Sequence, residues 1–192
     1  MSISILKPES IVNEVFALYE KYGKRKATDQ ELSELEQVSQ AAALAEEEGY
    51  EDEVILAAFF HNAGEILGAD YLREHGFSER LATLVESDLR ATRYMAYKYL
   101  GYYDHLSEAD KTELEARGGR MSKEEAYKFE LDPDAELFVR LRYLNEKARE
   151  IRKYKLNIPH IKLLAMSHLY KIMDKYLPAF LMTKSSIQPR IG

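Results

Sequence analysis

The chain has 192 residues, of which 46% are hydrophobic and 31% charged, a composition typical of one globular domain. The net charge of −6 argues against a nucleic-acid or anionic-membrane partner, and the absence of cysteine excludes disulfides, thiolate metal ligands and cysteine nucleophiles. Because no apolar run reaches membrane-spanning length and no signal-peptide pattern is present, we expect a cytoplasmic protein without a membrane partner.

Helical periodicity extends over almost the whole chain and predicts an all-α bundle of about seven to nine helices. Thr28, followed three residues later by Glu31, has the spacing of a capping box, and Gly49 is suited to end the helix that begins there. The first half of the chain is predicted to form helices over residues 9–22, 28–48, 51–63, 68–74 and 78–100.

The second half is predicted to continue in the same way. Ser107 and Ser122 are suited to cap two helices, and Asp134 begins another that runs to about Tyr154. Pro159 lies in the first turn of a last helix that ends at about Tyr176. We therefore expect one helical domain over residues 1–176 and an extended C-terminal tail over residues 177–192, where two prolines and a Lys-Ser-Ser stretch occur.

A histidine-asparagine pair, His61 and Asn62, closes the most apolar predicted helix. Residues 54–60 form an unbroken run of seven apolar residues, which covers every side of a helix and indicates burial all round. An unsatisfied buried polar group costs about 1–3 kcal/mol. The pair therefore needs polar partners inside the protein.

Other predicted helices also carry polar residues on their apolar faces. Asp88 shares a face with Leu84 and Val85, and Asn145 interrupts a similar stripe near Leu141. Gln37 borders the apolar stripe of its own helix. Each residue alone is most simply a satisfied core polar group, but together they predict a polar cluster at the centre of the bundle, where such folds build their sites.

Several segments resemble a known family. The chain resembles the HD-domain proteins, which are all-helical metal-dependent phosphohydrolases and their oxygenase relatives. The resemblance lies in a polar position on a first helix, an apolar helix ending in His61 and later polar positions. Within this family, the chain resembles the phosphonate-cleaving mixed-valent diiron oxygenases. The resemblance covers about residues 30–150 and is carried by residues 56–64, 68–80, 93–94, 118–119 and 142–147.

This resemblance implies that most metal-ligand positions are changed. The histidine of the His-Asp pair is kept, but its aspartate is replaced by an amide. A later histidine ligand of the family falls on Asp88, its final aspartate falls on Asn145, and the other ligands are replaced too. A lysine that holds the phosphonate falls on Thr92, and the lid residues fall near Ala27 and Gln30. The vestigial metal-site positions are Gln37, His61, Asn62, Glu65, Asp88 and Asn145.

These replacements bear on the chemistry. A dinuclear site needs imidazole nitrogens and a bridging carboxylate, which Asn62 and Asn145 cannot supply because they carry no charge. We expect no metal cofactor and no catalytic residues. A single Mg²⁺ held by Glu65, Asp88 and amide oxygens is the alternative. Without metal, His61 is predicted to hydrogen-bond to Asp88.

An anion-binding mouth is predicted beside the Gly118-Gly119 loop, with solvated surface side chains as the alternative. Six tyrosines between residues 94 and 127 are suited to a pocket, a core or a homodimer face. His160 and His168 are expected to be packing or surface residues. The candidates for the mouth are Arg90, Thr92, Arg93, Arg117 and Arg120.

The function predicted from the sequence is that of a degenerate HD-domain protein. It would bind a small phosphonate or phosphate-like ligand, or act as a regulatory protein, without catalysis. One alternative is an HD-type metal-dependent phosphohydrolase or diiron oxygenase of organophosphonates with an unconventional ligand set. Another is a structural module that keeps the fold for its surface.

Overall fold

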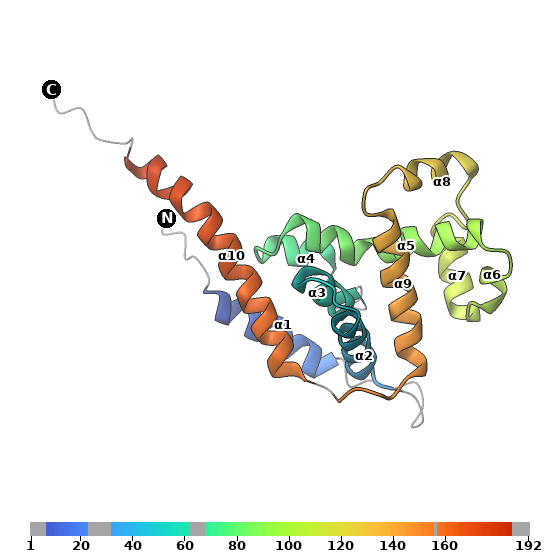
Figure 1. The fold of residues 1–192 in the computed structure, drawn as a ribbon, viewed down its shortest axis with the longest axis horizontal. Coiled ribbons are helices and arrows are strands. Elements are labelled where there is room, and N and C mark those ends of the chain that lie inside the picture. Colours follow the sequence, from blue (N-terminus) through green and yellow to red (C-terminus); the bar gives the residue numbers. More distant parts are fainter. Residues whose placement is uncertain (1–6, 23–31, 62–67, 156, 186–192) are drawn as a thin grey trace.

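The computed structural model describes residues 7–22, 32–61, 68–155 and 157–185 and is shown as a ribbon in Figure 1. The regular elements of these residues are all α-helices, which confirms the predicted all-α class. The helices are α1 (Pro8–Tyr22), α2 (Glu34–Glu47), α3 (Asp52–Phe60), α4 (Ala69–Glu74), α5 (Glu79–Lys98), α6 (Tyr102–His105), α7 (Glu108–Ala116), α8 (Lys123–Glu130), α9 (Ala135–Glu150) and α10 (Ile158–Ser185).

The short helix α3 lies at the centre of the bundle. It packs against α2, α5, α9 and α10, while α9 also packs along α2 and α5. The pair α1 and α10 lies on one side, and α6, α7 and α8 gather around the far end of α5 (Figure 1). Residues 54–60 of α3 are all buried, as their unbroken apolar run predicts.

Aromatic rings connect α3 to its neighbours. The rings of Phe16 and Phe59 stack with centroids 5.3 Å apart, and Tyr19 lies against the same Phe59 ring at 5.1 Å. On the other side, Phe60 meets Phe77 edge-on at 5.7 Å. Such pairs add to the free energy of burial, so these rings hold α1 and the start of α5 onto α3.

Serine caps fix several helix starts. Ser78, Ser107 and Ser122 each accept a hydrogen bond from a backbone N–H in the first turn of their helix, as predicted. In α2 the capping box is made by Ser33 and Glu36, whereas the predicted box residues, Thr28 and Glu31, lie outside the described residues. The described helix therefore begins at Glu34, later than the sequence indicated.

The number of helices and two further boundaries differ from prediction. The described residues form ten helices instead of seven to nine, in part because Tyr102–His105 makes a short helix where a loop was expected. The helix α9 ends at Glu150 instead of near Tyr154. The extended tail predicted from residue 177 is wrong as far as Ser185, since α10 continues through Pro178. Proline costs a helix one hydrogen bond, but its fixed φ is itself helical.

None of the helices in the described part of the chain combines the length and apolar character needed to cross a membrane.

The aromatic packing predicts a large effect of truncation at Phe59, which is fully buried. Replacing Phe59 with Ala should lower the free energy of unfolding by about 3–5 kcal/mol, because the change removes ring contacts and leaves a cavity. Tyr127→Ala is a suitable control, since that side chain is 63% exposed and its loss should change stability by less than about 0.5 kcal/mol. Urea denaturation followed by circular dichroism measures both, and equal losses would contradict the packing described here.

Candidate functional site

A cavity of about 700 Å³ opens between the start of α2, the end of α3, and helices α4, α5, α7 and α9. This volume lies in the range of small-molecule pockets, roughly 300–1,000 Å³. Its wall is highly charged, with carboxylates and arginines side by side. Three of the predicted site residues, His61, Asp88 and Arg117, line it, together with Arg142 and Arg149.

Asp88 is the polar centre of this cavity. It projects from α5 and accepts hydrogen bonds from Arg142 Nη1 at 2.9 Å and from Asn145 Nδ2 at 3.3 Å, both on α9. Burial raises the pKa of Asp88, but the charges of Arg142 and His61 and these hydrogen bonds lower it below its ordinary value. Asp88 is therefore ionised, and it joins α5 to α9.

Asn145 and Arg142 lie one turn apart on the inner face of α9. Asn145 is 4% exposed, as its position in the apolar stripe predicts. Asn145 Oδ1 and Arg142 Nη2 are buried without a hydrogen-bond partner among the described residues. Buried polar atoms of this kind are rare, so each indicates a place where a further polar group fits.

His61 is the C-cap residue of α3 and points toward the same cavity. Its Nδ1 lies 2.6 Å from the carbonyl oxygen of Ala58, so we assign the hydrogen to Nδ1 and leave Nε2 as an acceptor. Burial lowers the pKa of His61 to about 4, although Asp88 and the Ala58 carbonyl act in the opposite direction. The ring is therefore neutral at pH 7.

The predicted hydrogen bond between His61 and Asp88 is not formed. Both carboxylate oxygens of Asp88 accept from α9, one from Arg142 and one from Asn145. A charged guanidinium is a stronger partner for a carboxylate than a neutral imidazole. His61 thus lines the same cavity as Asp88 and interacts with its charge, but does not hydrogen-bond to it.

The remaining vestigial positions are not all brought to the cavity. Gln37 donates through Nε2 to the backbone carbonyl of Leu32 at 3.0 Å, at the start of its own helix. The deeply buried amide of α2 is instead Gln40, which exchanges hydrogen bonds with the backbone of Tyr154. Asn62 and Glu65 lie outside the described residues.

The arginines of the predicted anion mouth do not converge. Arg90 pairs with Asp132 at 3.2 Å, and Arg93 binds the backbone carbonyls of the glycine loop. Arg120 stacks over the ring of Tyr103 at 4.5 Å. In a helix, residues two apart point to nearly opposite sides, so Arg90 cannot face the cavity that Asp88 lines.

The other two members of the predicted mouth are closer to the centre. Arg117 lines the cavity and pairs with Glu113 at 3.0 Å. Thr92 is buried one turn after Asp88, and its hydroxyl donates to the backbone carbonyl of Asp88 at 2.8 Å. Arg117 is thus the one residue of the predicted set that presents a cation to the cavity.

Sequence reasoning missed the residues that complete the site. Arg142 Nε donates to Glu146 Oε1 at 2.8 Å and to the hydroxyl of Tyr102 at 3.2 Å. One turn further along α9 from Asn145, Arg149 pairs with Asp110 at 3.3 Å. Arg142 and Arg149 occupy the same helical face as Asn145, and this spacing was the available signal.

These residues do not fit a dinuclear metal centre. In the part of the chain that the structure describes, no three His, Asp or Glu side chains are placed to hold one ion. The carboxylate that is best placed for a ligand, Asp88, already binds a guanidinium and an amide. A metal ion there would meet a fixed positive charge close by, which opposes binding.

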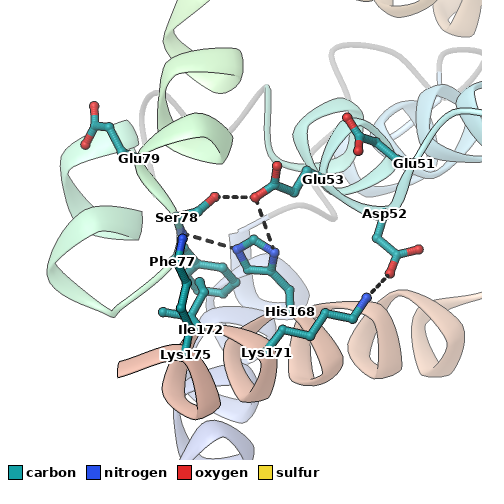
Figure 2. A pocket seen from close by; sticks show the side chains of 10 residues that line it. All are labelled: Glu51, Asp52, Glu53, Phe77, Ser78, Glu79, His168, Lys171, Ile172 and Lys175. Atoms are coloured by element: carbon teal, nitrogen blue, oxygen red, sulfur yellow. Dashed lines mark hydrogen bonds and ion pairs between the residues drawn. The ribbon is translucent and has the colours of Figure 1, made fainter. Parts of the chain in front are cut away.

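A second cavity, of about 600 Å³, lies where α10 meets the starts of α3 and α5 (Figure 2). Ser78 donates its hydroxyl hydrogen to Glu53 Oε1 at 2.6 Å, while its backbone N–H donates to His168 Nε2 at 3.2 Å. Lys171 pairs with Asp52 at 3.0 Å on the same side of α10. His168 is buried, which agrees with its predicted packing role, and these bonds anchor α10 to the bundle.

Comparison with known proteins places the chain among relatives. No protein-family model matches it. The chain is 32% identical over 162 residues to the uncharacterized protein L432 of Acanthamoeba polyphaga mimivirus, with 74% of each chain covered. The chain belongs to the family of L432.

The chain is also similar to a protein with a named activity. This chain is 26% identical over 166 residues to a glycine-betaine-forming 1-hydroxy-2-(trimethylamino)ethylphosphonate dioxygenase of Leisingera caerulea. The match covers 77% of this chain and 84% of the dioxygenase. It supports the HD-like family that the sequence motifs resemble.

The neutral, partly buried imidazole of His61 predicts an acid-sensitive contribution to stability. His61 in the unfolded chain takes up a proton near its ordinary pKa of 6.5, whereas the folded chain does so only near 4. Between these values the unfolded state binds more protons, so the free energy of unfolding falls as the pH falls. The loss from this group should be at most about 3 kcal/mol.

Urea denaturation of wild type, His61→Gln and the control His105→Gln at pH 7 and pH 4.5 measures this effect. The drop in stability between the two pH values should shrink in His61→Gln and stay unchanged in His105→Gln, whose Nδ1 contacts only its own turn. An equal drop in all three proteins would show that His61 is not buried in its neutral form.

Proposed function

We propose that this chain is a non-catalytic member of an HD-like family that binds a small phosphonate- or phosphate-bearing ligand in its central cavity. The observation that carries the proposal is the cavity wall itself. Three arginines, Arg117, Arg142 and Arg149, line a space of about 700 Å³ in which His61 is the one imidazole among the described residues. Arginine is well suited to planar, charge-assisted hydrogen bonds with phosphonate and phosphate oxygens.

The distribution of charge favours a ligand that carries both signs. Arg149 pairs with Asp110, and Arg117 pairs with Glu113, so each cation at the wall has an anion beside it. A zwitterion can replace both partners of such pairs, with its anionic end toward the arginines and its cationic end toward the carboxylates. The dioxygenase relative acts on a molecule of this kind, which bears a trimethylamino group and a phosphonate.

The proposed absence of catalysis follows from the donor set. Hydrolysis or oxygenation in HD-type sites depends on two cations and a bridging carboxylate. At the two vestigial positions that meet here, Asp88 is engaged by Arg142, and Asn145 carries no charge. Recognition without turnover is the function that such a site can still perform, either as a ligand sensor or as a regulatory subunit.

Thermal-shift assays with 2-aminoethylphosphonate, methylphosphonate and inorganic phosphate test the ligand class. At 100 times the Kd a bound ligand adds about 2.7 kcal/mol, which corresponds to a Tm rise of roughly 5–10 °C for a chain of this size. We expect this rise with the zwitterion and a smaller one with phosphate. Removal of one charge-assisted contact in Arg149→Gln should weaken binding about tenfold.

Arg140→Gln is the matched control. Arg140 and Arg149 lie on α9, both are about 40% exposed and both pair with a carboxylate, but Arg140 binds Glu48 and does not line the cavity. The proposal requires Arg140→Gln to bind as the wild type does. Absence of any Tm change with all three compounds would refute the ligand class, and two transition-metal ions per chain after chelator-free purification would support an enzyme instead.

A further inference from the structure

Arg142 has an unusual position for an arginine on a helix. Its side chain is only 6% exposed, on the inner face of α9. The guanidinium contacts Asp88 through Nη1 at 2.9 Å and Glu146 through Nε at 2.8 Å, and Tyr102 hydrogen-bonds to the same Glu146. One buried cation therefore serves two carboxylates, whose side chains are 29% and 30% exposed.

The cation is needed where it lies. A carboxylate moved out of water without a partner is strongly disfavoured, and breaking such a pair is far more costly than never having formed it. Burial lowers the pKa of Arg142, but Asp88, Tyr102 and Glu146 raise it, so the guanidinium keeps its charge. Arg142 in turn helps to lower the pKa of Asp88, which stays an anion beside it.

This cation stands beside positions that the family resemblance assigns to metal ligands. Asp88 occupies one of them and Asn145 another, and the Asn145 amide donates to Asp88 instead of binding an ion. Arg142 lies one turn before Asn145 and reaches the other oxygen of the same carboxylate. Each oxygen of the carboxylate thus accepts a hydrogen bond from α9.

We propose that the Arg142 guanidinium supplies, as part of the protein, the positive charge that a metal ion supplies in an HD-type centre, and thereby closes this centre to divalent cations. The inference does not depend on the ligand proposed above. It predicts that removal of the guanidinium charge turns Asp88 and Glu146 into an unbalanced anionic pair, which takes up a cation from solution.

Manganese is a suitable probe because its paramagnetism reports binding directly. Titration with Mn²⁺, followed by electron paramagnetic resonance, should show no Asp88-dependent site in the wild type. Arg142→Met should bind Mn²⁺ at least tenfold more tightly than the wild type, and adding Asp88→Asn should abolish that gain. Arg142→Lys, which keeps the charge, should still exclude Mn²⁺.

Arg140→Met is the control on the same helix, since Arg140 pairs with Glu48 outside the cavity. It should leave Mn²⁺ binding unchanged. A purely structural arginine would alter stability in Arg142→Met without creating a site that depends on Asp88. A folded Arg142→Met that takes up Mn²⁺ no better than the wild type overturns the proposal, and so does an Asp88-dependent Mn²⁺ site in the wild type.

If Arg142→Met does not fold, the neutral pair Asp88→Asn with Arg142→Met decides the question. The proposal requires this pair to fold and to exclude Mn²⁺, because neither charge remains to be balanced at that contact. A double variant as unfolded as the single one would overturn the charge argument. If the wild type excludes Mn²⁺ but shows no Tm rise with any of the three ligands, only the proposed function is refuted.

Discussion

The ion pair between Asp88 and Arg142 is the constraint on which the centre of this molecule depends. It joins α5 to α9, and because the Arg142 side chain is only 6% exposed, its charge needs this partner. Glu146 and Tyr102 extend it along α9 and toward α6, and Asn145 completes the shell of Asp88. The geometry of the cavity is therefore set by a polar network that is strong only while all its members are present.

This network is compatible with the fold because α3 takes over the apolar part of the core. With residues 54–60 all buried, α3 contributes no polar side chain between Glu53 and its end, where His61 meets the cavity. The rings of Phe16, Phe59 and Phe77 hold the surrounding helices onto it. Apolar packing thus determines where the helices lie, and the charged network determines which polar groups their inner faces direct into the cavity.

The helical class and the inward faces of the helices could be predicted from the sequence, whereas the hydrogen-bond and ion-pair partners of the inward polar side chains could not. Helical periodicity placed Asp88 and Asn145 on inner faces, and both line or border the central cluster. Arg142 shares the face of Asn145, but an arginine four residues before Glu146 also has the spacing of an ordinary exposed helix pair, so the pattern alone did not distinguish the two. Burial of the Arg142 side chain is a tertiary effect of packing α9 against α5.

The errors at α2 and α10 have equally local causes. Gln37 borders the apolar stripe, but it lies close enough to the N-terminus of α2 for its amide to hydrogen-bond to the backbone there. The buried amide is that of Gln40, one turn later. Pro178 was a reasonable stop signal, yet the helical φ of proline lets α10 continue to Ser185. Local signals give a helix its preferences, and packing decides between them.

The residues at positions 88 and 145 together determine the electrostatics between α5 and α9. The family resemblance implies a neutral histidine at the first position and a charged aspartate at the second, whereas this chain has Asp88 and Asn145. The negative charge of this chain therefore lies on α5, across from Arg142 on α9. The ion pair attracts the two helices to each other, and the amide of Asn145 donates to Asp88 where an aspartate would repel it. Other combinations at these two positions would not have this result. A carboxylate at both would place a third anion, beside Asp88 and Glu146, around one guanidinium, and an uncharged pair would leave Arg142 without its partner on α5.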